Sequence, residues 1–413
     1  MAIKALRGMK DLLPPLSEKY LFFLENASSI AKRFGFKYIE TPILEETSLF
    51  KRSVGESSDI VGKEMYQFID KGKNDVSLRP EGTAGIVRSF IEHKLDKKEG
   101  NFRFYYHGPM FRYERPQKGR FREFHQFGVE SFGEKSVYED ANIIVLTKEI
   151  LEFFKIDYNL KINSLGCPKC MPNYRKKLLN FLDKVEAKVC QDCLRRKATN
   201  PIRVLDCKVD ACKDIYIDAP KLLDNLCSEC KSDFSTLKEL LKLNNIKYEI
   251  DIFLVRGLDY YTKTAFEFVN KDIGSQNAIA GGGRFDGLVE FLGGKPTPAI
   301  GFAIGVERIL DLFELSPKKR DGVYLGVMLE EGMPKAFKIS SILRKSTAVE
   351  FFYQKKSLRA HLKAADRTFS KYAAIIGEDE LRDNKIWLKD LEEKREEILG
   401  IEEFLKRFGR GNV

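Results

Sequence analysis

The sequence has no hydrophobic run long enough to cross a membrane. Its longest apolar segments, such as AIGFAIGV at residues 299–306, are far shorter than the roughly 20 residues of a membrane-spanning helix. The first stretch, MAIKALRGMKDLLPP, contains no apolar core of the kind found in secretion signals. We therefore expect no membrane insertion and no export, and we expect the protein to be cytoplasmic.

Two common nucleotide-binding signatures are also missing. The pattern G-x-x-x-x-G-K-[ST] does not occur, and GGGRFDG at residues 281–287 fails to fit G-x-G-x-x-G because Asp286 stands at the last glycine position. The sequence likewise has no internal repeat and no low-complexity tract. Any nucleotide must therefore be held in a different way.

The composition describes a soluble globular chain of several parts. Hydrophobic residues make up 43% and charged residues 32% of 413 residues, a length that suits two or three domains better than one core. Lysine and arginine number 71 against 61 acidic residues, a net charge of +10. This excess fits an anionic partner such as nucleic acid or a nucleotide, and it equally fits simple solubility.

All eight cysteines lie between residues 167 and 230. They form four close pairs: Cys167 and Cys170, Cys190 and Cys193, Cys207 and Cys212, Cys227 and Cys230. A reducing compartment disfavours disulfides, whereas repeated C-x-x-C pairs have the spacing of structural zinc sites. Eight thiolates suffice for two tetrahedral sites, and the alternative is a set of reduced thiols in an ordinary helical insert. The spacing leaves open which pairs share a metal.

Hydrophobic periodicity predicts an α+β fold followed by a smaller α/β domain. Helical patterns at residues 17–35, 83–95 and 139–158 accompany strand patterns that suggest an antiparallel sheet. We expect this domain to span residues 1–318, with a cysteine-rich insertion at residues 167–235. After a basic linker around 316–321, strands and helices alternate through residues 322–413, which predicts a largely parallel sheet.

The segment VRGLDYYTKTAFEFV, residues 255–269, has the composition of a strand but a polar entrance. Arg256, Asp259, Tyr260 and Tyr261 fall within six positions. Burying a guanidinium without a partner costs roughly several kcal/mol of folding free energy. The sequence offers no evident partner for Arg256.

A second polar segment, FRYERPQKGRFREFHQFGVESFG, spans residues 111–133. Period-two alternation places Arg112 and Glu114 on one face of a first strand, and Gln126, Gly128 and Glu130 on one face of a second. Arginine beside glutamate on a strand face suits a triphosphate and the atoms attached to it. The alternative is a solvated hairpin with surface ion pairs.

Two shorter motifs also have two interpretations. In LRPEGTAG, residues 78–85, Glu81 and Thr83 could hold an ammonium group or could cap the N-terminus of the helix that follows. In GFAIGVERIL, Arg308 could be a surface charge or a phosphate clamp. Gly301 and Gly305 permit close backbone approach, which favours the clamp.

Together these stretches resemble the class II aminoacyl-tRNA synthetases. TPILEE is similar to the first motif of the class, FRYERPQKGRFREFHQFG to the second and AIGFAIGVERIL to the third. RGLDYY and GGGRFDGL are similar to two motifs of the histidyl-tRNA synthetase family, the second of which usually has tyrosine where this chain has Phe285. The resemblance covers the whole chain.

The resemblance implies a reaction, its substrates and an assembly. A six-stranded antiparallel catalytic sheet would activate L-histidine with ATP and Mg²⁺, forming histidyl-adenylate and pyrophosphate. Histidine would then pass to the 3′ end of tRNA(His). The C-terminal domain would read the anticodon, and the protein would be a homodimer.

The resemblance also implies a role for each matching residue. The expected catalytic residues are Arg256 and Arg112, which would both hold the α-phosphate of ATP. The remaining expected ATP ligands are Glu114 near the adenine, Arg120, and Arg308 on the γ-phosphate. The expected histidine ligands are Glu81, Gly82, Thr83 and Gln126 around the α-ammonium, Glu130 and Tyr261 on the imidazole nitrogens, and Tyr260 as a pocket wall. The loop residues Arg115, Gln117 and Lys118 would meet the tRNA acceptor end.

Two other functions stay open at this point. A noncatalytic paralogue serves as regulatory subunit of the histidine-biosynthetic ATP phosphoribosyltransferase, but such paralogues typically lack the C-terminal domain and erode the motif residues, and this chain keeps both. A zinc-dependent nucleic-acid-binding module would account for the cysteines but not for Arg256 or the arginines of the second motif. Asp259 is expected to orient Arg256 or a neighbouring strand.

Overall fold

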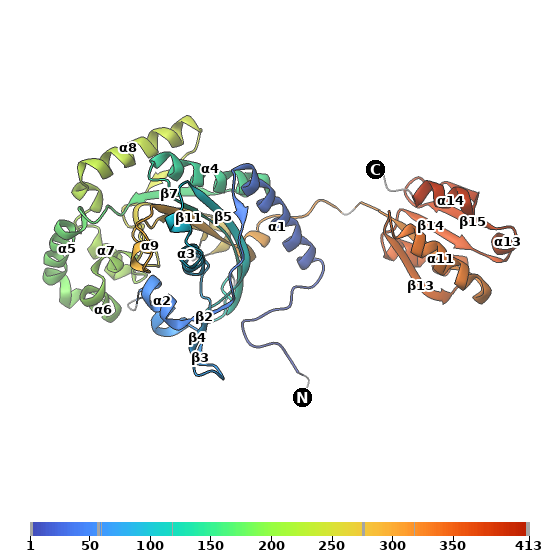
Figure 1. Ribbon diagram of the computed structural model, residues 1–413, viewed down its shortest axis with the longest axis horizontal. Coiled ribbons are helices and arrows are strands. Elements are labelled where there is room, and N and C mark those ends of the chain that lie inside the picture. The colour runs from blue at the N-terminus through green and yellow to red at the C-terminus, as the bar shows by residue number, and fades with distance from the viewer. Residues whose placement is uncertain are drawn as a thin grey trace. The chain divides into compact units, whose positions relative to one another are not determined.

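The computed structural model describes residues 3–409 apart from 56, 57, 59, 118, 275, 276 and 318 (Figure 1). It divides into two compact units, Met1–Glu314 and Leu315–Val413. The division falls at the edge of the basic linker. None of the helices in the described ranges has the length and apolar character needed to span a bilayer.

The first unit is built on an eight-stranded sheet with the order β1-β5-β6-β11-β10-β9-β7-β8. Its six central strands are all antiparallel to their neighbours: β5 (Phe102–Phe111), β6 (Glu123–Phe132), β11 (Ala299–Gly305), β10 (Ala278–Arg284), β9 (Thr262–Val269) and β7 (Asn159–Ser164). The short strands β1 (Lys37–Tyr38) and β8 (Glu249–Ile250) add one parallel pairing at each edge. The α+β prediction is confirmed, and the six expected strands form the centre of a wider sheet.

Helices cover both faces of this sheet. They are α1 (Leu16–Arg33), α2 (Thr47–Val54), α3 (Thr83–Glu92), α4 (Val137–Phe153), α9 (Leu288–Phe291) and α10 (Val306–Leu310). Because strand side chains alternate, Tyr106 and Phe132 pack with α3, whereas Phe127 packs edge-on against Phe23 of α1. A three-stranded sheet of β2 (Leu44–Glu46), β4 (Asp75–Leu78) and β3 (Gln67–Ile69) completes the unit apart from its insertion.

The insertion lies between β7 and β8 and is helical. Its helices are α5 (Met171–Val185), α6 (Gln191–Thr199), α7 (Asp210–Tyr216) and α8 (Ser228–Leu243), and the short 3-10 segment η4 (Pro201–Asp206) follows α6. In Figure 1 these green to yellow elements gather at one end of the sheet. The helix α8 continues past residue 235 and packs against α4.

Three local expectations are wrong. The strand expected at residues 255–261 is a loop, because β9 begins only at Thr262. Arg112 and Glu114 do not lie on a strand face, because β5 ends at Phe111, its last pairing with Glu123. The pattern of residues 37–53 predicts a strand that runs into a turn at Pro42, but helix α2 occupies much of this stretch, with the buried Leu49, Phe50 and Val54 at helical spacing.

The second unit contains one five-stranded sheet and four helices. The strands are β12 (Val323–Val327), β13 (Val349–Lys355), β14 (Tyr372–Ile376), β15 (Lys385–Asp390) and β16 (Glu396–Gly400). The helices are α11 (Met333–Leu343), α12 (Leu358–Arg367), α13 (Glu378–Arg382) and α14 (Ile401–Phe408).

The sheet of the second unit is only half parallel. In the order β13-β12-β14-β15-β16, the first two pairings are parallel and the last two antiparallel. The expectation of a largely parallel sheet is therefore wrong for β15 and β16. The mostly exposed sequence EEILG of β16 carries only one buried side chain and gives no strand signal of its own.

Candidate active site

A deep pocket opens on the α3 side of the large sheet. Residues from all the polar motifs line it: Glu81, Thr83, Arg112, Glu114, Arg120, Gln126, Arg256, Tyr260, Tyr261 and Arg308. The second strand of the hairpin contributes as alternation predicted, because Gln126, Gly128 and Glu130 share one face of β6. The motifs thus meet in one cavity although Glu81 and Arg308 lie more than two hundred positions apart in the sequence.

One end of the pocket concentrates arginine side chains. The guanidinium of Arg112 donates from Nε to the Pro80 carbonyl (2.9 Å) and lies 5.3 Å from the centre of the Phe124 ring. Arg308 donates from Nε to the Gly119 carbonyl (3.2 Å), and Arg120 is ion-paired with Glu114. The backbone and ring contacts fix the direction of both guanidinium groups.

These positive charges act on one another. Burial lowers the pKa of Arg308, and the neighbouring charges of Arg120 and Arg112 lower it further. Holding like charges together in a partly dehydrated cavity is unfavourable unless an anion joins them. This end of the pocket is therefore built for a polyanion.

Arg256 has a protein partner that the sequence did not reveal. Its Nη1 group is ion-paired with Glu267 of β9, and its guanidinium lies 5.6 Å from the centre of the Tyr261 ring. Burial by itself lowers the pKa of Arg256, but the charge of Glu267 and the contact with Tyr261 raise it overall. The expectation that the partner is missing from the sequence is wrong, and the ion pair keeps the cation in the pocket.

Two buried carboxylates, Glu81 and Glu130, form an acidic part of the site, and Glu81 lies near Arg112. Glu81 accepts the backbone N–H groups of Thr83 (2.7 Å) and Ala84 (2.8 Å), so it caps helix α3 while still lining the pocket. The Thr83 hydroxyl donates to Oε1 of Glu130 at 2.6 Å. Burial raises the pKa of Glu130 well above its usual range, and the nearby charge of Glu81 raises it further.

Several polar atoms near Glu81 and Glu130 are buried without a hydrogen-bond partner. They include Oε1 of Gln126, Oε2 of Glu130 and the hydroxyl of Tyr260. Buried polar atoms are nearly always paired in native proteins. Three such atoms at one site indicate that a polar ligand binds there and pairs with them.

Two glycines make room for the charged side chains. A Cβ atom at Gly301 would lie 1.8 Å from Oε2 of Glu130, and one at Gly281 would lie 2.5 Å from both terminal nitrogens of Arg256. Any larger residue would therefore push the carboxylate or the guanidinium out of position. The glycine-rich strand β10 is explained by this packing rather than by phosphate binding.

Aromatic rings form one wall of the pocket. The rings of Tyr260 and Tyr261 lie 4.8 Å apart, and Phe285 meets Tyr260 edge-on at 5.7 Å. Phe285 is fully buried in the core cluster behind the pocket. The hydroxyl that tyrosine would carry at this position is therefore not needed for the wall.

Some expected residues lie away from the cavity surface. Glu130 pairs with Gly301 across β6 and β11, and its carboxylate fills the space over that glycine and accepts a hydrogen bond from Thr83, which lines the cavity. Gly82 leaves space for the Tyr106 ring, which would be 2.3 Å from a Cβ atom there. Arg115 and Gln117 lie in the exposed loop after β5, and Lys118 falls outside the described residues.

Tyr106 and Glu267 are among the pocket residues that sequence reasoning missed. Tyr106 lines the cavity, and its hydroxyl lies 3.5 Å from Oε1 of Glu130. Glu267 lines it as the partner of Arg256. The signal for Glu267 was available, because it is the single acidic residue in the strand TKTAFEFV.

The eight cysteines gather in two groups of four free thiols. Cysteine cluster A contains Cys167, Cys170, Cys227 and Cys230; cysteine cluster B contains Cys190, Cys193, Cys207 and Cys212. In each cluster the four sulfur atoms lie within 4.8 Å of one another. The outer pairs of the sequence therefore combine with each other, and so do the inner pairs.

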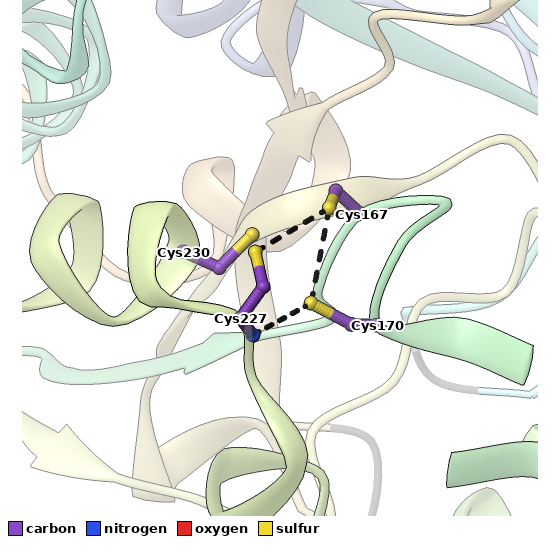
Figure 2. A group of neighbouring side chains, drawn as sticks. All are labelled: Cys167, Cys170, Cys227 and Cys230. Atoms are coloured by element: carbon purple, nitrogen blue, oxygen red, sulfur yellow. Dashed lines mark hydrogen bonds between the residues drawn. The ribbon is translucent and has the colours of Figure 1, made fainter. Parts of the chain in front are cut away.

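The geometry of both clusters fits a tetrahedral metal. In cluster A, Sγ of Cys167 lies 3.8 Å from Sγ of Cys170 and 3.8 Å from Sγ of Cys227 (Figure 2). Zinc–sulfur bonds of about 2.3 Å give a tetrahedron whose sulfur–sulfur edges are about 3.8 Å. The backbone N–H of Cys227 also donates to Sγ of Cys170 at 3.1 Å, which favours the thiolate.

Two family models together match most of the chain. A family model described as histidyl-tRNA synthetase matches residues 8–309, and one described as anticodon binding domain matches residues 322–410. A histidine–tRNA ligase of Nitratiruptor sp. is 66% identical over 98% of this chain and 100% of its own length, and that of Sulfurimonas denitrificans is 60% identical over 96% and 98%. The crystal structure of apo S. aureus histidyl-tRNA synthetase superposes with a TM-score of 0.85 at 33% identity, covering 99% of this chain and 100% of that one.

Proposed function

Because the chain belongs to the histidyl-tRNA synthetase family, it joins histidine to tRNA with ATP, and we propose that the pocket on the large sheet is where this happens. The similar ligases cover the full chain, which favours this activity over a regulatory subunit. We further propose that the enzyme works in the cytoplasm, where translation consumes its product.

The mutual closeness of the arginines supports ATP as the polyanion. Arg112 would hold the α-phosphate and Arg308 the γ-phosphate. Arg120 and Glu114 would lie beside the adenine. Each side chain is already oriented by a backbone carbonyl or an ion pair. Little reorganisation is then needed when negative charge develops in the transition state.

Amino-acid activation would proceed by direct displacement. The histidine carboxylate attacks the α-phosphorus, the bond to the pyrophosphate oxygen breaks, and charge builds on the α-phosphoryl oxygens. Arg256 and Arg112 stabilise that charge, so no side chain needs to act as a nucleophile. In the second step the terminal hydroxyl of tRNA attacks the carbonyl of histidyl-adenylate and releases AMP.

ATP would bring Mg²⁺ with it as part of the substrate. Each described carboxylate that lines the pocket already accepts a hydrogen bond or an ion pair, so the ion would be held mainly by phosphate oxygens. Bound there, Mg²⁺ neutralises charge on the departing pyrophosphate.

The acidic part of the site supports histidine recognition. Glu81, Thr83 and Gln126 would surround the α-ammonium. Glu130 and Tyr261 would bind the two imidazole nitrogens, with Tyr260 as the wall. The unpaired oxygen of Glu130 gives selectivity, because an amino acid without ring nitrogens would leave it buried and unsatisfied.

The remaining surfaces would bind tRNA. Arg115 and Gln117 are exposed in the loop after β5, where the acceptor end would approach the pocket. We propose the same role for Lys118 from its place in the sequence motif. The C-terminal unit matches the anticodon-binding family model and would recognise the anticodon.

A single assay tests the function. We expect aminoacylation of total tRNA with histidine and with none of the other nineteen amino acids, because only imidazole satisfies the buried acceptor at Glu130. The same protein should exchange pyrophosphate into ATP only when histidine is present. Charging with a second amino acid at a comparable rate would contradict the assigned specificity.

We propose that both cysteine clusters hold structural zinc. Four thiolates in tetrahedral arrangement with backbone N–H donors form a closed site, leaving no position for a substrate. Zinc here would stabilise the insertion rather than take part in the reaction.

Metal analysis tests the zinc sites. We expect about two zinc ions per chain in protein purified without added metal, because each cluster supplies four ligands. The Cys167→Ser variant should retain about one ion, held by cluster B. Less than about half an equivalent in the wild-type protein would reject structural zinc.

We also propose that the protein is a homodimer. Large apolar side chains are exposed near the TPILEE motif, among them Tyr38, Ile43 and Leu44 (42% exposed for Ile43). Phe68 and Ile69 of β3, in the same three-stranded sheet as Leu44, are also exposed. An apolar surface of this kind is typical of a subunit interface.

Sedimentation tests the dimer. We expect Ile43→Asp to shift the wild-type dimer towards monomer, because a carboxylate cannot be desolvated at an apolar interface without a partner. The matched control is Ile398→Asp in the C-terminal unit, which is 57% exposed and should leave the mass unchanged. A monomeric wild-type protein at micromolar concentration would rule the proposal out.

A further inference from the structure

We propose that Arg203 and Asn200 of the insertion are positioning residues for the loop that carries Arg256, and that metal binding in cysteine cluster B holds them there. The inference rests on the proposed function, since it assigns these residues a part in histidine activation. It makes the insertion a support for the active site.

Two hydrogen bonds connect the insertion to this loop. The guanidinium of Arg203 donates from Nη1 to the backbone carbonyl of Arg256 at 2.7 Å. The side-chain amide of Asn200 donates to Oδ1 of Asp259 at 2.9 Å. The contacts bracket the stretch from Arg256 to Asp259, directly before Tyr260 and Tyr261.

The loop itself has little regular structure to fix it. Residues 251–261 belong to no helix or strand, and the stretch contains Gly257. An irregular segment with glycine has many accessible conformations. A cationic side chain must nevertheless stand within a fraction of an ångström of its reacting phosphate, and a misplacement of about 1 Å can cost on the order of 100-fold in rate.

Cluster B determines where Arg203 and Asn200 lie. Both residues belong to residues 194–206, the segment between the ligands Cys193 and Cys207. The backbone N–H of Cys207 donates to the Val204 carbonyl at 3.0 Å, directly after Arg203. A metal that joins Cys193 to Cys207 would close the segment into a loop and restrict its conformations.

Two features anchor this segment: the ligand Cys193 near one end, and the buried Pro201 and Val204 of η4 near the other. Cys193 is the buried residue of α6, and the other residues of that helix, all described, are partly or fully exposed. A helix of this length has marginal stability alone, so it depends on the attachment at Cys193. Val204, the residue after Arg203, belongs to the same buried cluster as Val255, the residue before Arg256. This packing connects the insertion to the loop that carries Arg256.

The first experiment measures histidine-dependent pyrophosphate exchange in Arg203→Ala. We expect kcat to fall about 10- to 100-fold while KM for histidine changes less than about threefold, because the loop loses its support but the histidine ligands remain. Arg203→Lys keeps a donor and should recover much of the rate. Arg175→Ala, an exposed arginine of α5 in the same insertion, should behave as the wild type.

The second experiment tests the link to the metal. Cys193→Ser should lose one zinc ion per chain and show a fall in kcat similar to that of Arg203→Ala. Loss of the ion with unchanged exchange would overturn the metal link, and unchanged exchange in Arg203→Ala at full zinc content would overturn the positioning role. Histidine-dependent exchange by the wild-type protein tests the proposed function separately, since it does not depend on either variant.

Discussion

Arg256→Ala should lower the rate of histidine-dependent pyrophosphate exchange by about a thousandfold or more. Removing one preorganised donor to a developing negative charge typically costs about 10²- to 10³-fold, and this donor also carries a full charge. The substitution would in addition leave the Glu267 carboxylate beside the α-phosphate without its cation. Both effects act in the same direction, because the pocket loses a positive charge and exposes a negative one.

Two further variants separate these effects. Arg256→Ala combined with Glu267→Gln should regain part of the activity, because the uncompensated carboxylate is gone. Arg115→Ala removes an exposed arginine from the loop after β5 and should leave exchange unchanged while it impairs aminoacylation. The oligomeric state of Arg256→Ala should match that of the wild type. Near-normal exchange in Arg256→Ala would refute its catalytic role.

The ion pair between Arg256 and Glu267 was not predicted from the sequence. The alternation that places Gln126 and Glu130 on one face is a local property of an extended strand, and it was predicted correctly. Arg256 and Glu267 are only eleven positions apart, but a loop that precedes β9 directs the guanidinium back onto that strand. Such a return depends on tertiary contacts, which periodicity does not encode.

The cysteines and the hairpin illustrate the same limit. Ligand spacing predicted zinc sites of four thiolates, but the nested pairing of the two clusters follows from how the insertion folds back on itself. Arg112 was expected on a strand, yet the ladder of β5 and β6 ends at Phe111 and Glu123, although the Arg112 N–H still donates to the Arg122 carbonyl at 2.9 Å. The resemblance to the synthetases was recognised because motifs identify a family even where the backbone between them is unpredictable.

The pocket combines groups that lower the stability of the empty protein. Glu130 is almost fully buried, with an unpaired oxygen and a second carboxylate, Glu81, nearby. Arg112, Arg120 and Arg308 repel one another in the same pocket. Ligands would relieve both, since the imidazole N–H satisfies the carboxylate and the phosphates satisfy the guanidinium groups. Binding energy of this kind favours closely matched substrates over others.

Glu130→Gln should weaken histidine binding about 10- to 100-fold while ATP binding changes much less. A hydrogen bond to a charged acceptor contributes about 1.5–3 kcal/mol, and the amide that replaces the carboxylate is a weaker acceptor. The Thr83 hydroxyl can still donate to the amide oxygen, so the surrounding structure should be kept. Separate titrations with histidine and with ATP measure the two affinities. Equal losses for both ligands would count against the imidazole contact.

The same variant should stabilise the protein without ligands, and the gain should depend on pH. Burial raises the pKa of Glu130, so the folded state disfavours its charged form. For a raised pKa, the wild-type stability is greatest below the unfolded-state pKa and falls as the pH rises through the folded-state value. The neutral amide removes that fall, so the Tm advantage of Glu130→Gln should be small near pH 5 and larger at pH 8.

A second buried glutamate provides the control for this pH dependence. Glu139 is as inaccessible as Glu130, but it is ion-paired with Arg103 at 2.6 Å. Glu139→Gln should therefore lower Tm at pH 8, because it leaves Arg103 without its partner charge. Opposite shifts in the two variants would identify the unpaired state of Glu130 as the source of the instability. A lower Tm for Glu130→Gln throughout the pH range would show instead that its charge stabilises the empty pocket.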